Sequence, residues 1–333
     1  MNKYIRHLFF LIGIVAILVM VVGFDLSFES LKSLLNRVGI YFPLALLLWV
    51  IIYAINTLSW RQLLNSLDSR TIPWCELYKF TVSGFAINYI TPGGLNGGEP
   101  YRILELREYV GTTRATSSTL LYVIIHIGSH LLFWALGAIM LMVKGLSTTY
   151  AIGALLVIVV ALCLLYAFHL LMKNGVTDFF TLLLLKLPWL GKYIYKFKEK
   201  NRNILLLIDQ EVREVYTHRP CNFYSAFGLE FLARIVGCLE ISFFLMPLMG
   251  TTNFLYSYLI IAIASLMGNL LFFLPMQLGG REGGFTLAFT ILHLSPQYGL
   301  FVGLLVRLRE LVWIGIGVFL IQMGKRRSIK KDS

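Results

Sequence analysis

Two short segments of similar sequence, PGGLNGGE at residues 92–99 and PMQLGGRE at residues 275–282, decide how this chain folds. Aligned on the proline, both follow the pattern P-x-x-L-x-G-x-E, so each ends an apolar stretch with a glycine-rich break and a carboxylate. Backbone that breaks a helix at membrane depth is tolerated only where it is buried in protein or lines a polar cavity. Such breaks at corresponding places in two halves of a chain are typical of a transporter binding site.

The composition predicts a membrane protein. Of the 333 residues, 58% are hydrophobic and 14% are charged, and the mean hydropathy is +0.76. Soluble domains have about 45–50% apolar and about 25% charged residues. We therefore predict an all-α, polytopic membrane helix bundle of about eight spans, built as one integral membrane domain over residues 1–333.

Apolar stretches that are long enough to cross about 30 Å of hydrocarbon predict the spans. They lie near residues 8–24, 40–59, 117–143, 150–172, 223–248, 253–275 and 297–323. Two shorter stretches, near 76–91 and 283–294, adjoin the repeated motif and are expected to be half-helices, re-entrant hairpins or short spans. The first stretch has no cleavage site after it, which favours a retained signal anchor.

The formal net charge of +12 reflects basic loops and not a nucleic-acid site, so no nucleic-acid partner is expected. The 173–222 segment and the tail at 325–331 are both basic, and basic loops mark the cytoplasmic side of an inner or plasma membrane. Both termini are therefore predicted to be cytoplasmic. Eight crossings satisfy this orientation if 76–91 is re-entrant and 283–294 crosses.

The chain divides into two pseudo-repeats of about 1–172 and 173–333, with an amphipathic connector at about 173–222. Each motif is followed by a long apolar helix that carries polar groups. Within the connector, apolar residues recur at helical spacing and predict a helix that lies on the membrane or against the bundle. These residues are Ile204, Leu205, Ile208, Val212 and Val215.

Charged residues at the breaks and on the last helix are the candidate substrate-binding residues. A charge near the bilayer centre costs about 3 kcal/mol or more, so each needs a partner or a water-filled path. We expect Glu99 to pair with Arg102, and Arg281 with Glu282. The helix starts after the breaks also offer backbone N–H groups, so the site suits an anion such as a lipid phosphate. The binding set is Glu99, Arg102, Arg281, Glu282, Arg307 and Glu310, on a motif backbone of Pro92, Gly97, Gly98, Pro275, Gly279 and Gly280.

A second polar group is expected on two other helices. Glu230 and Arg234 are spaced as an i,i+4 pair, for which a structural and a functional role are equally open. His126 and His130 belong to a ladder of aromatic residues four apart and are expected to be satisfied core histidines. The four scattered cysteines form no C-x-x-C pair, so neither a metal site nor a cofactor is expected.

The two motifs resemble those of a known family. Residues 94–102 resemble its G-x-G-E-x-x-R motif, and residues 274–283 resemble its P-x-x-x-G-x-R-E motif. The family is the transmembrane domain of lysylphosphatidylglycerol synthases, also called the flippase-like or UPF0104 family, and the resemblance covers nearly the whole chain. It implies a domain that moves aminoacylated phospholipid across the bilayer. Because the chain ends at Ser333 after a basic tail, the soluble aminoacyl-transferase domain, and with it lysyl transfer, is not expected.

The sequence therefore favours a flippase-like lipid transporter that moves a phospholipid or a lipid-linked head group, anionic or zwitterionic. No G-x-x-x-x-G-K-[ST] motif occurs, so ATP is not expected to be the direct energy source. Its partners would be the lipid and either a second copy of the chain or a lipid-synthesis enzyme. The alternatives are a membrane enzyme that acts on a lipid-linked sugar or phosphate, for which Asp25 and Glu29 are weak candidates, and a membrane scaffold.

Overall fold

The computed structural model describes residues 28–65, 72–91, 97–145, 148–185, 191–250, 252–271 and 279–323. Within these ranges every regular element is a helix, which confirms the predicted class. The first predicted span, the basic tail and the motif prolines Pro92 and Pro275 lie outside the described residues.

Six helices match predicted spans. They are α3 (Tyr41–Asn65), α6 (Thr112–Val143), α7 (Thr148–Asn174), α10 (Pro220–Met249), α11 (Phe254–Leu270) and α13 (Pro296–Gln322). By length and composition, α3, α6, α7 and α10 are able to cross a membrane. The protein is therefore an integral membrane protein. Helix α13 is 27 residues long, but it carries three charged residues in its middle.

The two short stretches beside the motifs form separate helices. Helices α4 (Trp74–Ile90) and α5 (Gly98–Val110) flank the first break, while α11 and α12 (Gly280–Ile291) flank the second. At about 1.5 Å per residue, the 12 residues of α12 extend roughly 18 Å, against about 30 Å of hydrocarbon. Helix α12 is thus too short to cross alone, which argues against the crossing expected for 283–294.

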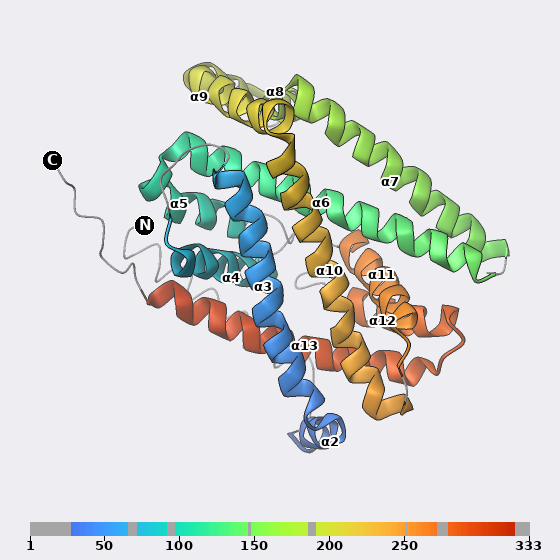
Figure 1. The fold of residues 1–333 in the computed structure, drawn as a ribbon. Helices are drawn as coiled ribbons and strands as arrows, with labels where there is room; N and C mark the ends of the chain where they lie inside the picture. Colours follow the sequence, from blue (N-terminus) through green and yellow to red (C-terminus); the bar gives the residue numbers. More distant parts are fainter. Residues whose placement is uncertain are drawn as a thin grey trace.

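The helices on either side of the connector follow the same order, and we call α3–α6 the first series and α10–α13 the second series. In both α3–α6 and α10–α13, a long helix precedes a 17-residue helix, a break, a short helix and another long helix. In Figure 1, α3 runs from α2 (Phe28–Val38) toward α9 (Gly191–His218), and its neighbour α10 runs back from α9. Helices α6 and α13 also run in opposite directions (Figure 1). The series interlock, because α4 packs on α13 and α11 packs on α6.

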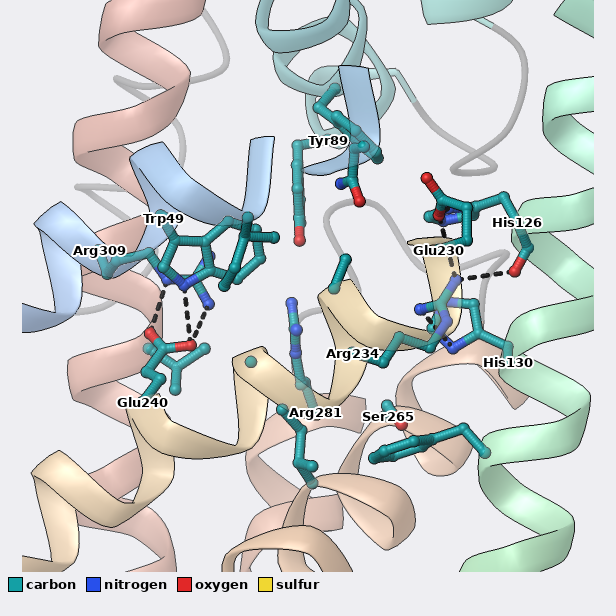
Figure 2. Close-up of a pocket in the computed structure, with 18 of the residues that line it drawn as sticks. Trp49, Tyr89, His126, His130, Glu230, Arg234, Glu240, Ser265, Arg281 and Arg309 are labelled. Carbon is teal, nitrogen blue, oxygen red and sulfur yellow. Dashed lines mark hydrogen bonds and ion pairs between the residues drawn. The ribbon is translucent and has the colours of Figure 1, made fainter. Parts of the chain in front are cut away.

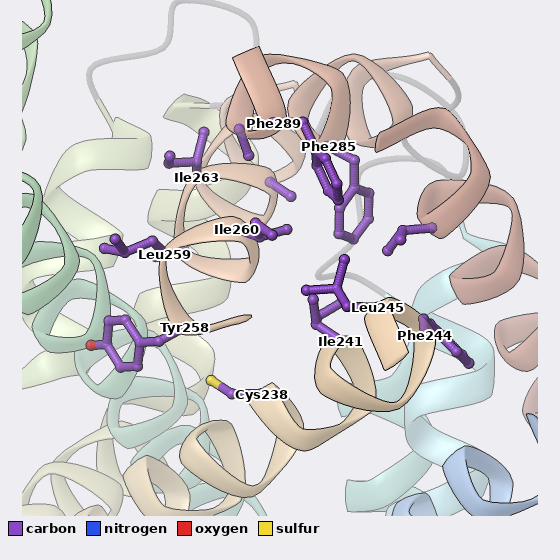
Figure 3. Packing of buried hydrophobic residues seen from close by; sticks show 14 of the residues in the cluster. Cys238, Ile241, Phe244, Leu245, Tyr258, Leu259, Ile260, Ile263, Phe285 and Phe289 are labelled. Atoms are coloured by element: carbon purple, nitrogen blue, oxygen red, sulfur yellow. The ribbon is translucent and has the colours of Figure 1, made fainter. Parts of the chain in front are cut away.

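Each series is packed around an apolar core, and each core also takes residues from the other series. In the second, Ile241, Phe244, Tyr258 and Phe285 belong to a buried cluster drawn from α10, α11 and α12 (Figure 3). In the first, Trp60 belongs to a cluster that also includes residues of α4, α6 and α9. By contrast, α7 exposes a row of large apolar side chains, as a lipid-facing helix must.

The connector contains α8 (Val176–Leu185) and α9 (Gly191–His218), and the apolar residues at helical spacing lie on α9. Ile208, Val212 and Val215 are buried in the core of the first series. Asp209 fixes the start of α8, because its Oδ1 accepts a hydrogen bond of 2.8 Å from the backbone N–H of Thr177. The connector therefore packs on the bundle and is not a loose linker.

Candidate functional site

A cavity of about 150 Å³ lies where the two series of helices meet (Figure 2). Helices α3, α4, α6, α10, α11, α12 and α13 all contribute to its wall. Charged side chains reach this cavity from α10, α12 and α13, and charged groups inside a membrane bundle mark a place where a polar ligand can bind. The polar lining consists of Trp49, Asn56, Tyr89, His126, His130, Glu230, Arg234, Glu240, Ser265, Arg281 and Arg309.

Arg281 stands at the start of α12, directly after the second break, and lines this cavity. Its Nη1 pairs with Glu310 of α13, whose side chain is fully buried. Glu310 also accepts a hydrogen bond of 3.0 Å from Arg307 Nη1, and Arg307 Nε donates to Glu282 Oε1 at 2.6 Å. The break thus delivers an arginine to the cavity and ties it to α13 through a chain of ion pairs.

The neighbouring wall is built from Arg309, Glu240 and Trp49. Arg309 Nε and Nη2 donate to the two oxygens of Glu240, at 2.7 and 3.1 Å. Trp49 Nε1 donates to Glu240 Oε2 at 3.0 Å, and the guanidinium of Arg309 lies 3.9 Å from the centre of the Trp49 ring. Arg309 Nη1 also lies 3.8 Å from Glu310 Oε1, so the two groups of ion pairs form one network.

The pairing expected inside the second motif is wrong. Arg281 pairs with Glu310, and Glu282 pairs with Arg307, so neighbours in sequence take different partners. The reason is geometric: residues that are adjacent on a helix point about 100° apart. The shared partners on α13 belong to a stripe of small and polar residues that is visible in the sequence as Gly299, Gly303, Arg307, Glu310 and Gly317.

A third cluster joins α6 to α10 at the far side of the cavity. Glu230 Oε2 lies 2.8 Å from His126 Nδ1 and 4.0 Å from Arg234 Nη2, so the expected i,i+4 pair is loose. Arg234 instead donates to Ser129 Oγ at 2.8 Å and to the backbone oxygen of His126 at 2.7 Å, and it contacts the His130 ring. Both histidines line the cavity, and the His126 side chain is 25% exposed, so they are not sealed in a core.

The first motif forms a separate cluster outside the cavity lining. Arg102 is buried, and its guanidinium lies 4.8 Å from the centre of the Phe85 ring, which itself faces the cavity. Its ion pair with Glu99 is long, at 3.9 Å, and Glu99 accepts a hydrogen bond of 2.9 Å from Asn88 Nδ2. The structure therefore brings Arg281, Glu230, Arg234 and the two histidines to one cavity and leaves Glu99 and Arg102 behind its wall.

The helix starts after the breaks are less open to an anion than the sequence predicts. The backbone N–H of Gly98 donates to Asn88 Oδ1 at 2.7 Å, and that of Gly279 donates to Glu282 Oε2 at 2.9 Å. Each of these first N–H groups thus has a side-chain acceptor nearby. Arginine side chains, and not these N–H groups, supply the positive charge at the cavity.

Comparison with known proteins agrees with this architecture. The family model described as "Lysylphosphatidylglycerol synthase TM region" matches residues 10–317. The chain belongs to this family. A UPF0104 membrane protein of Methanothermobacter thermautotrophicus is 39% identical over 100 residues, a match that covers 29% of this chain and 28% of the relative. No solved structure matches.

Sequence reasoning missed Arg309 and Glu240 as site residues. Arg309 is two positions from Arg307 and therefore lies on another face of α13. It is nevertheless as buried as Arg307, with 1% of its surface exposed. A usable signal existed, since three charged residues at 307–310 within an apolar helix all need partners. Glu240 needed a partner for the same reason.

Proposed function

We propose that this member of the family is a flippase-like lipid transporter. The polar head group enters the central cavity while the acyl chains stay in the bilayer. The cavity between the two series of helices carries the proposal, because charged residues that line a cavity within a membrane bundle are typical of a substrate pathway. Its volume, about 150 Å³, suits a head group and is far smaller than a whole phospholipid.

The chemistry of the wall favours a head group that contains a phosphate. Arg234, Arg281 and Arg309 come from three different helices and reach the same cavity. One guanidinium group can bind two phosphate oxygens at once, through two parallel charge-assisted hydrogen bonds. Tyr89 points toward Arg281 across the space between them (Figure 2), and adds a neutral hydroxyl to the wall. The substrate class that fits is an anionic or zwitterionic phospholipid.

The arrangement of helices supports alternating access. Two series of similar helices that run in opposite directions place a site at their interface, as in transporters with inverted repeats. In this reading the pairs α4–α5 and α11–α12 enter from opposite sides without crossing, and six crossings, including the predicted span at 8–24, keep both termini and the connector cytoplasmic. Rocking one series against the other would open the cavity to each leaflet in turn.

Reconstitution tests this proposal. Purified protein in liposomes should move a fluorescent phosphatidylglycerol between leaflets without ATP, as measured by quenching of the outer leaflet. Arg281→Ala should slow this movement at least tenfold, since loss of a charge-assisted contact of about 1.5–3 kcal/mol corresponds to a factor of ten or more. Arg213→Ala is the matched control, because Arg213 is exposed on α9. Equal rates for the two variants would remove the reason to place the substrate in the cavity.

A further inference from the structure

We infer that Glu230 and His126 form a proton-binding site, and that the cavity takes up one proton with each anionic head group. This inference rests on the proposed transport function and names its driving ion. It makes the movement of an anionic lipid a cotransport with a proton, driven by a pH gradient.

Glu230 is the least compensated carboxylate of the cavity. Its side chain is 1% exposed, and its Oε2 is held by His126 at 2.8 Å. The nearest guanidinium nitrogen, Arg234 Nη2, is 4.0 Å away, beyond hydrogen-bond distance. Its other oxygen, Oε1, is buried and makes no hydrogen bond of good geometry among the described residues, although the Tyr122 hydroxyl lies close enough to interact with the Glu230 side chain. A proton on this carboxylate removes a buried charge that is only partly compensated, and such a charge is costly.

Glu240, the other carboxylate that lines the cavity, and Glu310, which is buried behind it, have much stronger ion pairs than Glu230. Glu240 accepts hydrogen bonds from Arg309 and from Trp49, and Glu310 contacts three arginines. Protonation of either would break strong ion pairs in a buried place. Glu230 instead faces an imidazole that can accept or donate, and its one ion pair within the described chain, with Arg234, is long at 4.0 Å, so the pair can gain a proton without breaking a short ion pair.

The charges of the site balance before any ligand binds. Counting the described network, there are four arginines and four carboxylates, and with neutral histidines their sum is zero. The groups that surround Glu230 and His126 are Arg234 on the same helix as Glu230, Arg281 across the cavity, Arg102 behind the cavity wall, and Tyr122 and His130 on α6. The balanced set is Arg234, Arg281, Arg307, Arg309, Glu230, Glu240, Glu282 and Glu310.

An anionic head group upsets this balance. A phosphodiester that binds Arg234 and Arg281 adds one negative charge to a site with little water, and an unmatched charge there is costly. A proton from water that enters with the head group adds to the Glu230–His126 pair and restores a net charge of zero. Release of the head group on the other side releases the proton there. The cycle carries no net charge, so it responds to a pH gradient and not to the membrane potential.

The first experiment measures proton binding without transport. Soluble dihexanoyl phosphatidylglycerol is added to purified protein in weakly buffered detergent that contains a pH-sensitive dye. We expect uptake of about one proton for each lipid bound. Glu230→Gln, which has the shape of the protonated acid, should bind the lipid without proton uptake. Glu214→Gln, with a side chain that is 51% exposed on α9, should keep the uptake. Lipid binding to the wild type without proton uptake would overturn the inference.

The second experiment uses liposomes and separates the two proposals. A gradient of one pH unit should shift the steady-state leaflet ratio of an anionic lipid about tenfold for one-to-one coupling, and a potassium–valinomycin potential should leave it unchanged. Glu230→Gln should equalise the leaflets with or without the gradient. Leaflet exchange that ignores the gradient refutes proton coupling alone, whereas no exchange under any condition refutes the transport proposal. If Glu230→Gln does not fold, His126→Gln replaces it and should lower proton uptake at least tenfold at the same pH.

Discussion

Glu310 offers the sharpest test of the buried charge network, because three arginines depend on one carboxylate. Its side chain is fully buried, and it contacts Arg281, Arg307 and Arg309. Glu310→Gln keeps the shape and removes the charge, so the three guanidinium groups lose their common partner. Removing one partner of a buried ion pair costs about 3–5 kcal/mol. With three arginines involved, we expect about 4 kcal/mol or more.

The assay is thermal unfolding in detergent, followed by tryptophan fluorescence. At roughly 2 °C per kcal/mol for a large domain, Glu310→Gln should lower Tm by about 8 °C. Glu214→Gln, the exposed control, should change stability by less than about 0.5 kcal/mol. Both variants replace a glutamate with a glutamine, so the difference between their Tm values measures the effect of burial and ion pairing alone.

A double-mutant cycle then tests whether charge balance is the cause. Arg281→Gln alone leaves the network with one surplus negative charge, and Glu310→Gln alone leaves one surplus positive charge. The double variant is balanced again, so its cost should fall below the sum of the single costs by about 1–3 kcal/mol. Additive costs, or a Glu310→Gln variant as stable as the exposed control, would refute the reasoning.

Three further predictions concern packing, the motifs and topology. A Cβ at Gly317 would lie 2.4 Å from the Ala86 Cβ, while one at Gly315 meets nothing within 4 Å, so Gly317→Val should cost about 1–3 kcal/mol more than Gly315→Val in the same melts. Glu99→Gln and Glu282→Gln should each abolish lipid movement in liposomes while folded protein still reaches the membrane; normal transport by both would contradict the role of the motifs. Single cysteines placed in α9, in a background without native cysteines, should resist an impermeant external reagent in intact cells, and strong labelling would reverse the proposed orientation.

Much of the fold could be predicted because a membrane imposes length and polarity on each span. The helices begin and end within about six residues of the expected limits, and α10, at Pro220 and Met249, comes closer than that. The stripe on α13 was also visible, since Gly299 and Gly303 let α12 approach and Gly317 lets α4 approach. The length of a short apolar stretch does not show whether it crosses the membrane. For α12 this is decided by the helices that pack against it.

The partners in the ion pairs could not be predicted from the sequence, for a different reason. Arg309 and Glu240 are 69 positions apart, and they meet only because α13 crosses α10 at one height in the bundle. Local spacing favoured Arg281–Glu282 and Glu230–Arg234, yet partners on other helices took precedence. A buried charged side chain pairs with the group that offers the best hydrogen-bond geometry in three dimensions. That group is seldom the nearest charged residue along the chain.

The breaks explain why so many charges can be held at one depth. A continuous helix through the second motif would carry Arg281 past the cavity, whereas the break lets α12 begin beside it and point its first turn toward α13. The resulting network is balanced, which lets it persist among apolar helices without a ligand. The same balance makes the site sensitive to any added charge, because the surroundings provide little screening. An anion that enters this neutral cavity adds one unmatched charge, and a proton taken up beside the anion removes it. Glu230 beside His126 is the carboxylate of the described wall that can take this proton at least cost, because its only ion pair, with Arg234, is 4.0 Å long.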